Sequence, residues 1–113
     1  MRAIVCGSRN YKDWELLYRV LDGLGITHVI EGGARGADRL AREWALSRLI
    51  PLSTFDADWG AHGKAAGGIR NQQMLDEGKP DLVVAFPLAK SSGTWDMVRK
   101  AKAANVSVKL IEN

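Results

Sequence analysis

Residues 26–38 read Ile-Thr-His-Val-Ile-Glu-Gly-Gly-Ala-Arg-Gly-Ala-Asp, and this stretch decides the fold. Its first part, residues 26–31, is rich in β-branched side chains and stops at Gly32-Gly33, as a buried strand does. Its second part opens a segment, residues 37–48, in which Ala37, Leu40, Ala41, Trp44 and Ala45 recur at helical spacing. A strand that passes through a glycine-rich loop into a helix is the repeating unit of parallel α/β sheets.

The same change of hydrophobic period recurs along the whole chain. Strands are predicted at residues 2–6, 50–56, 81–86 and 106–111, and helices at residues 14–24, 68–77 and 94–104. Asp13 is a predicted N-cap for the first helix. This order favours right-handed crossovers, so we predict a Rossmann-like, doubly wound, mainly parallel sheet of five strands with about four helices. Residues 1–113 form one predicted domain.

Composition and charge exclude several classes of protein. The chain has 113 residues, of which 46% are hydrophobic and 26% charged, values typical of a globular domain rather than a disordered chain. A single cysteine, Cys6, excludes an internal disulfide, and we expect it to be buried rather than nucleophilic. The N-terminal apolar run is too short for a signal peptide, and no stretch is long enough to span a membrane. We therefore expect a cytoplasmic protein without a membrane partner.

The loops that follow the strands combine glycine with positive charge. In an open parallel sheet, ligands bind at the carboxyl ends of the strands, which here lead into residues 7–10, 32–38, 58–70 and 87–94. Glycine allows close backbone approach, helix N-termini attract anions, and arginine or lysine binds phosphate oxygens. The alternative, that the glycines only form tight turns, is less favoured because four loops share the pattern. The predicted ligand-binding residues are Gly7, Ser8, Arg9, Gly32, Gly33, Ala34, Arg35, Gly36, Asp38, Trp59, Lys64, Arg70, Asn71, Ser92, Gly93 and Thr94.

Individual residues in these loops leave alternatives open. Arg70 is the strongest binding candidate, against an ion pair with Asp76 or Glu77. Asp38 either stabilises the start of its own helix, by capping or by interaction with the helix dipole, or binds a ribose hydroxyl. Trp59 either stacks on a base or, more favoured, seals the core. Gly36 and Ala37 leave the helix start bare, so that a phosphate can reach it.

No metal site or cofactor is predicted. His62 has no carboxylate or cysteine at ligand spacing and is expected to face solvent. Asp96 is the best candidate for acid–base chemistry, although an ordinary aspartate in a first helical turn is the favoured interpretation. Trp14 and Trp95, near helix starts, are candidate anchors for self-association, with local packing as an equal alternative.

Several of these segments together resemble a known family. They are Gly7-Ser8-Arg9, Gly32 to Asp38, Trp59, Gly67 with Arg70 to Met74, and Gly93-Thr94 with Asp96-Met97-Val98. The set, which spans essentially the whole chain in order, resembles the YspA-like (cpYpsA-related) branch of the SLOG superfamily. That superfamily includes the lonely-guy phosphoribohydrolases and the SMF/DprA proteins. The resemblance implies a Rossmann-like fold and recognition of nucleotides or nucleotide-derived signals.

The chain departs from the lonely-guy pattern at the segment that carries catalysis there. Those enzymes have Pro-Gly-Gly-x-Gly-Thr-x-x-Glu, whereas residues 87–97 here lack the glycine pair and place Met97 at the glutamate position. A methionine neither moves a proton nor stabilises an oxocarbenium ion.

Three functions therefore compete. The first is a module that binds, and so senses or sequesters, a nucleotide or nucleotide-derived phosphate ligand. The second is a phosphoribohydrolase that cleaves the N-glycosidic bond of a nucleoside monophosphate, with Asp96 as its acid–base group. The third, binding of single-stranded nucleic acid, ranks last because the net charge is only +3 and no extended basic stripe is visible.

Overall fold

The computed structural model describes residues 1–112 and contains one five-stranded sheet. All strand pairs are parallel and the strand order is β3-β2-β1-β4-β5. The strands are β1 (Arg2–Gly7), β2 (His28–Glu31), β3 (Leu52–Thr54), β4 (Leu82–Phe86) and β5 (Ser107–Leu110). The helices are α1 (Trp14–Asp22), α2 (Ala37–Ser47), α3 (Trp59–His62), α4 (Ala66–Gly78) and α5 (Ser92–Ala103), with a 3-10 turn at Gly63–Ala65. The predicted fold class is confirmed.

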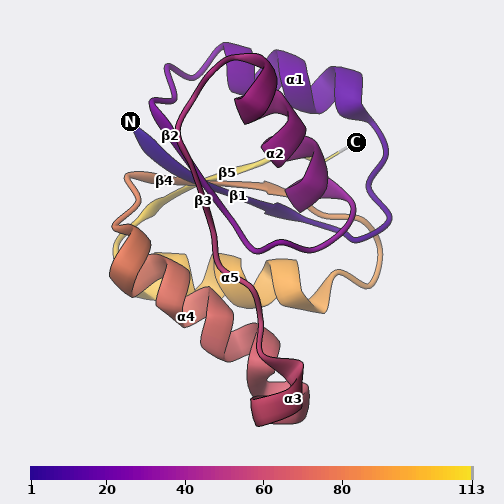
Figure 1. The fold of residues 1–113 in the computed structure, drawn as a ribbon, viewed down its shortest axis with the longest axis vertical. Coiled ribbons are helices and arrows are strands. Elements are labelled where there is room, and N and C mark those ends of the chain that lie inside the picture. Colours follow the sequence, from indigo (N-terminus) through magenta and orange to yellow (C-terminus); the bar gives the residue numbers. More distant parts are fainter. Residues whose placement is uncertain (113) are drawn as a thin grey trace.

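Helices cover both faces of the sheet, as Figure 1 shows. On one face, α1 and α2 bury Leu17, Leu21 and Trp44 in a cluster that also contains Val5 and Phe86 of the sheet. On the other face, α4 and α5 bury a second cluster. Removal of each such side chain from water contributes about 1.5–3 kcal/mol. The two apolar faces explain why the strands read as continuous hydrophobic runs.

The reversal of strand order lies between β1 and β4. The chain moves outward from β1 through β2 to β3, and then crosses to β4 on the opposite side of β1. Gly7 pairs with Phe86 at the carboxyl ends of these two strands. The loops after β1 and β4 therefore diverge from neighbouring points, which is where open α/β sheets form their ligand crevice.

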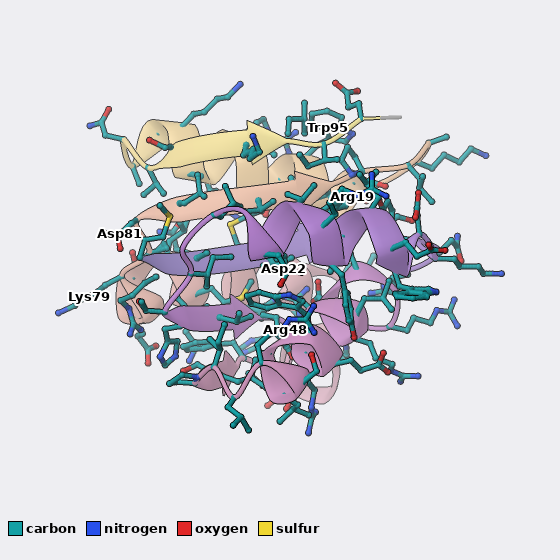
Figure 2. The ribbon with its side chains drawn as sticks, turned by 90° about the horizontal axis from the view of Figure 1, so that it is seen from above. Arg19, Asp22, Arg48, Lys79, Asp81 and Trp95 are labelled. Atoms are coloured by element: carbon teal, nitrogen blue, oxygen red, sulfur yellow. The ribbon has the colours of Figure 1, made fainter. Side chains whose placement is uncertain are left out.

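Polar contacts fix the helices that the sequence predicted. Asp13 Oδ1 accepts a hydrogen bond from Leu16 N, so the predicted N-cap of α1 is confirmed. At the other end of α1, Asp22 accepts from Trp44 Nε1 at 2.9 Å and pairs with Arg48 Nη2 at 2.9 Å. Figure 2 shows Asp22 and Arg48 side by side between α1 and the segment after α2. These contacts hold α1 and α2 together at the edge opposite the β1 and β4 loops.

Several boundaries differ from the predicted ones. The strand predicted at residues 50–56 is shorter, because only Leu52–Thr54 pairs with β2. The predicted loop before α4 contains α3 and the 3-10 turn, since Asp58 Oδ1 accepts from Ala61 N and caps α3. Helix α4 accordingly begins at Ala66 rather than at residue 68. No helix within residues 1–112 combines the length and the apolar character that a membrane crossing requires.

Candidate functional site

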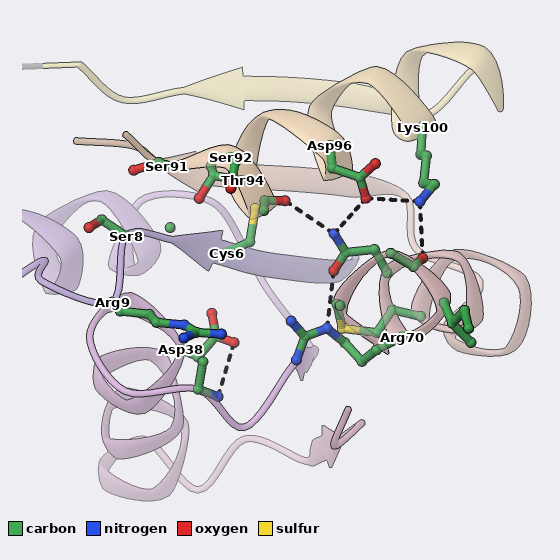
Figure 3. Close-up of a pocket in the computed structure, with 18 of the residues that line it drawn as sticks. Cys6, Ser8, Arg9, Asp38, Arg70, Ser91, Ser92, Thr94, Asp96 and Lys100 are labelled. Atoms are coloured by element: carbon green, nitrogen blue, oxygen red, sulfur yellow. Dashed lines mark hydrogen bonds and ion pairs between the residues drawn. The ribbon is translucent and has the colours of Figure 1, made fainter. Parts of the chain in front are cut away.

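A large cavity opens at the carboxyl ends of β1 and β4. Its volume is about 940 Å³ and it is lined by the loops after β1 and β2, by α3 and by the first turns of α4 and α5. Figure 3 shows residues of these separate segments converging on it. We call this the larger cavity. It lies at the reversal of strand order, where the topology predicts a ligand.

Positive charge dominates the wall of the larger cavity. Six lining residues are cationic, namely Arg9, Arg35, Lys64, Arg70, Lys90 and Lys100, whereas only Asp38 and Asp96 are acidic. Asp96 is paired with Lys100 at 2.9 Å. Burial disfavours the charge of Asp96, but hydrogen bonds from Lys100 and Asn71 and the charges of Lys100 and Arg99 outweigh this and lower its pKa. The cavity therefore attracts anions.

Arg70 lies across the loop that follows β2. Its Nη1 donates to Gly32 O at 2.6 Å and its Nε donates to Asn71 Oδ1 at 3.1 Å. A side chain at position 32 would collide with this guanidinium, so glycine is required there for the close approach. The alternative ion pair with Asp76 or Glu77 is wrong, because Asp76 instead accepts from Gln72. Arg35 and Arg70 line the same cavity, as the anion-site prediction required.

Asp38 is a buried carboxyl group that shapes the same loop. Its Oδ2 accepts from Gly32 N at 3.1 Å and from Ala34 N at 3.3 Å. Burial raises its pKa from 3.8 to about 7, against the lowering charge of Arg70 and the two amide bonds. Glu31, which the sequence analysis did not single out, supports the loop from beneath by accepting from Gly33 N at 2.9 Å. The contacts of Asp38 thus account for its burial, and a bond to a ribose hydroxyl stays a prediction.

The N-terminus of α5 opens into the larger cavity without a side-chain cap. Ser91, at the N-cap position, uses its hydroxyl to bridge Leu88 N and Leu88 O at 2.9 and 2.8 Å. The backbone amides of residues 92–94 have no hydrogen-bond partner within the described chain. Thr94 is only 4% exposed, and its hydroxyl forms no hydrogen bond with the described residues, yet its oxygen is not among the buried atoms without a partner and so is accessible from the cavity. Three amides and the Thr94 hydroxyl are thus available to an anion.

A hydrogen-bonded chain of side chains joins α4 to α5 behind this opening. Asn71 Nδ2 donates to Gly93 O at 3.1 Å and to Asp96 Oδ2 at 3.0 Å. Lys100 Nζ donates to the same Asp96 oxygen and to Gly68 O at 3.0 Å. Figure 3 shows Asp96 between the two donors. Asp96 is therefore an ionised, paired carboxylate, and the side chain of Asn71 is fully used within the protein.

Trp59 stands at the mouth of the larger cavity. Its side chain is 49% exposed, so the favoured prediction that it seals the core is wrong. The Arg9 guanidinium carbon lies 5.5 Å from its ring centroid, a cation–π contact. The helix turn α3, which begins at Trp59, projects away from the sheet in Figure 1, and this places the ring beyond the reach of the core.

Most of the predicted ligand-binding residues meet at the larger cavity. The lining includes Gly7, Ser8, Arg9, Ala34, Arg35, Asp38, Trp59, Lys64, Arg70, Asn71, Ser92, Gly93 and Thr94, together with Asp96. Gly32 and Gly33 line a smaller adjoining cavity instead. Gly36 lines neither, because it packs against the carbonyl groups of Ser8 and Arg9, and Ala37 N donates to Ser8 O at 3.2 Å. The predicted bare start of α2 is therefore wrong at these residues.

The sequence analysis missed other contributors to this site. Lys100 lies outside the glycine-rich loops, although its i,i+4 spacing from Asp96 was visible in the sequence.

Cys6 lines the cavity but is buried, as expected, and burial raises the pKa of its thiol. His62 is exposed, as expected. Within residues 1–112 no group of three or more His, Cys, Asp and Glu side chains is placed to hold a metal ion.

The fold and the cavity define a Rossmann-like α/β protein with an anion-attracting pocket at the reversal of strand order. Comparisons with known proteins agree with this class. A family model described as YAcAr, the YspA, cpYpsA-related SLOG family, matches residues 1–62. The Gene 61 protein of Mycobacterium phage D29 is 38% identical over 120 aligned positions, which cover 95% of this chain and 93% of that protein. The chain belongs to the YspA, cpYpsA-related SLOG family.

Proposed function

We propose that this protein binds a nucleotide or nucleotide-derived phosphate ligand in the larger cavity, and so senses or sequesters it. The observation that carries the proposal is the convergence of six cationic side chains on a cavity whose two acidic residues are held by the protein itself. Family membership supports a nucleotide-related ligand. A phosphate is the common anion whose several oxygens match guanidinium groups and backbone amides at once.

The N-terminus of α5 is the proposed seat of a phosphate group. The free amides of residues 92–94 would donate to its oxygens, and Thr94 would add a hydroxyl donor. Arg70 would contact it from α4, because Arg70 lines the same cavity. Charge-assisted bonds of this kind contribute about 1.5–3 kcal/mol each.

Thermal-shift measurements with a panel of nucleoside mono-, di- and triphosphates test the proposal. We expect at least one nucleotide to raise the melting temperature, and Arg70→Ala to abolish the rise. Arg39→Ala is the matched control, since Arg39 is an exposed arginine of α2 that lines neither cavity. Retention of the full rise in Arg70→Ala, or no rise for any phosphorylated compound with the unaltered protein, would contradict the proposal.

A second candidate function is N-glycosidic cleavage of a nucleoside monophosphate. Asp96 is an unsuitable proton donor, because its carboxylate is held ionised by Lys100 and Asn71. The observation that favours this function is Asp38, which lines the same cavity and whose pKa of about 7 suits proton transfer at neutral pH. Incubation with nucleoside monophosphates and detection of free base decides between binding and cleavage. Release that disappears in Asp38→Asn and survives in Asp96→Asn would assign the role to Asp38.

Binding of single-stranded nucleic acid remains the third prediction. The lining cations surround a cavity at one end of the sheet, whereas a strand-binding protein needs a groove that follows a backbone over several nucleotides. Oligonucleotide binding that weakens steeply with salt would support it.

Self-association through Trp14 and Trp95 also stays a prediction. Trp14 is exposed and packs edge-on against Tyr18, and Trp95 is half-buried against the core.

A further inference from the structure

A second, smaller cavity of about 600 Å³ adjoins the larger one. The two share five lining residues, among them Arg35, Trp59 and Arg70, so they form one continuous site divided by side chains. The smaller cavity adds Gly32, Gly33, Asp56 and Ala57, which belong to the loops after β2 and β3. A ligand that places its phosphate at α5 therefore has room for a further group on the β2 and β3 side.

Asp56 is the acidic residue of the smaller cavity. Its carboxylate lies against the backbone of Gly33, which has no side chain to displace it. No hydrogen bond or ion pair within residues 1–112 involves this carboxylate, although three arginines line the same cavity. Asp38 and Asp96 differ in that each accepts hydrogen bonds from other residues of the protein. Asp56 is thus the available acceptor in this part of the site.

An aromatic surface and a free cation complete the smaller cavity. Trp59 is half exposed, and the Arg9 guanidinium carbon lies 5.5 Å from its ring centroid. The exposed part of the indole ring is a surface on which a flat group can stack. Arg35 is exposed and forms no hydrogen bond or ion pair with the described residues. A flat ring with both donors and acceptors on its edges fits this combination of residues.

Guanine carries two adjacent donors on one edge and two adjacent acceptors on the neighbouring edge, an arrangement that adenine lacks. The N1–H and 2-amino groups of guanine are two parallel donors, which a carboxylate accepts in bidentate fashion, and its O6 and N7 accept from arginine. Adenine presents one amino group beside the N1 lone pair, which repels a carboxylate. We infer that the smaller cavity is a base-recognition subsite selective for guanine, in which Asp56 accepts from the base edge, Trp59 stacks on the ring and Arg35 donates to O6 and N7. This inference rests on the proposed nucleotide-binding function.

Titration calorimetry of the unaltered protein with GMP, IMP and AMP tests the inference directly. IMP keeps N1–H but lacks the 2-amino group, so we expect affinity to fall from GMP to IMP and again to AMP. A bidentate contact to a base edge corresponds to a preference of about tenfold for GMP over AMP. Equal affinities, or tighter binding of AMP, overturn the inference but leave the proposed function standing. Absence of binding by all three, and by their diphosphates, overturns the inference, and the proposed function then fails only if the whole nucleotide panel gives no thermal shift.

Asp56→Asn gives a second test, because it replaces two hydrogen-bond acceptors with one acceptor and one donor in addition to removing the charge. An amide offers one acceptor and one donor, which match N1–H and the 2-oxo group of xanthine, so we expect preference to change from GMP to XMP. Asp76→Asn is the control, since it makes the same change of charge at an exposed position of α4 that lines neither cavity. A variant that loses GMP and AMP affinity by the same factor would overturn the inference and indicate a contact with the ribose instead.

Discussion

Asn71 Nδ2 donates a hydrogen bond to Asp96 Oδ2 at 3.0 Å, and this contact ties α4 to α5 directly behind the larger cavity. The same side chain also holds Gly93 O and the Arg70 guanidinium. The contact between α4 and α5 and the position of the main cationic residue of the site therefore depend on one buried amide. Such fully satisfied networks hold side chains in one arrangement before a ligand arrives.

The first prediction concerns this amide. Asn71→Ala should lower the free energy of unfolding by about 2–3 kcal/mol, because it leaves Gly93 O and Arg70 Nε without a partner and removes one of the two donors to Asp96 Oδ2. Urea denaturation measures the change. Gln72→Ala is the control, since Gln72 bonds only to Asp76 at the surface, and it should stay within about 0.5 kcal/mol of the unaltered protein. Equal effects of the two substitutions would refute the role of Asn71.

A substitution at Thr94 should change nucleotide affinity without lowering the stability of the fold. Thr94→Val keeps the shape of the side chain but removes a hydroxyl that forms no hydrogen bond with the described residues, so the melting temperature should stay about the same. Nucleotide affinity should fall about fivefold, which corresponds to one hydrogen bond. Thr54→Val is the converse control, because Thr54 Oγ1 donates to Glu31 at 3.1 Å and lines neither cavity. It should lower stability without changing affinity.

Lys90 combines a cationic side chain with an unfavourable backbone. It has φ of 62° and lines the larger cavity, whereas Lys79 has φ of 50° beyond the end of α4 and lines neither cavity. Glycine relieves this left-handed conformation by about 1 kcal/mol. Both Lys90→Gly and Lys79→Gly should therefore raise the melting temperature, but only Lys90→Gly should weaken nucleotide binding, as calorimetry would measure. A loss of affinity in both variants would instead indicate a general effect of net charge.

The fold and the general position of the site could be predicted because both depend on patterns that are local in sequence. Alternation of strand and helix periods reports which faces are buried, and topology then brings the loops after the strands to one edge. That is why the sequence places Arg9, Arg35, Arg70 and Thr94 at one edge of the sheet, where they line the larger cavity. The early end of β3 could not be predicted, because it depends on pairing with β2 and not on the composition of the strand itself.

The individual roles of residues depended on tertiary contacts that no local pattern reports. Gly36 has the sequence context of a phosphate loop. Glycine is needed there, however, because a side chain would collide with the carbonyl groups of Ser8 and Arg9 in the loop after β1. Asn71 looks available at a helix start but is used entirely by Gly93, Asp96 and Arg70. Asp56 follows a strand without a motif around it, and only the approach of the loop after β2 makes it part of a cavity.

Gly36 yields a further prediction. It has φ of 80°, and a β-carbon there would collide with Ser8 O and the Arg9 carbonyl group. Gly36→Ala should therefore lower stability by more than about 2 kcal/mol, the sum of backbone strain and overpacking. Gly63 also has a positive φ of 54°, but nothing lies within 4 Å of an added β-carbon. Gly63→Ala should lose only about 1 kcal/mol in the same urea titration, and a loss equal to that of Gly36→Ala would contradict the packing role.

The last prediction follows from the buried carboxyl group of Asp38. Burial raises its pKa from 3.8 to about 7, so between these two pH values the folded protein holds a proton that the unfolded chain has released. Folding stability due to this group is therefore fully present below about pH 4, falls as the pH rises towards 7, and is constant above that. Asp38→Asn has no proton to lose, so the stability of the variant relative to the unaltered protein should increase from pH 4 to 7. Urea titrations of both proteins across this range measure the difference, in which the other titrating groups, including Glu31 and Asp96, largely cancel. A difference that stays constant with pH would mean that Asp38 has the same pKa in the folded and the unfolded protein, and would contradict the prediction.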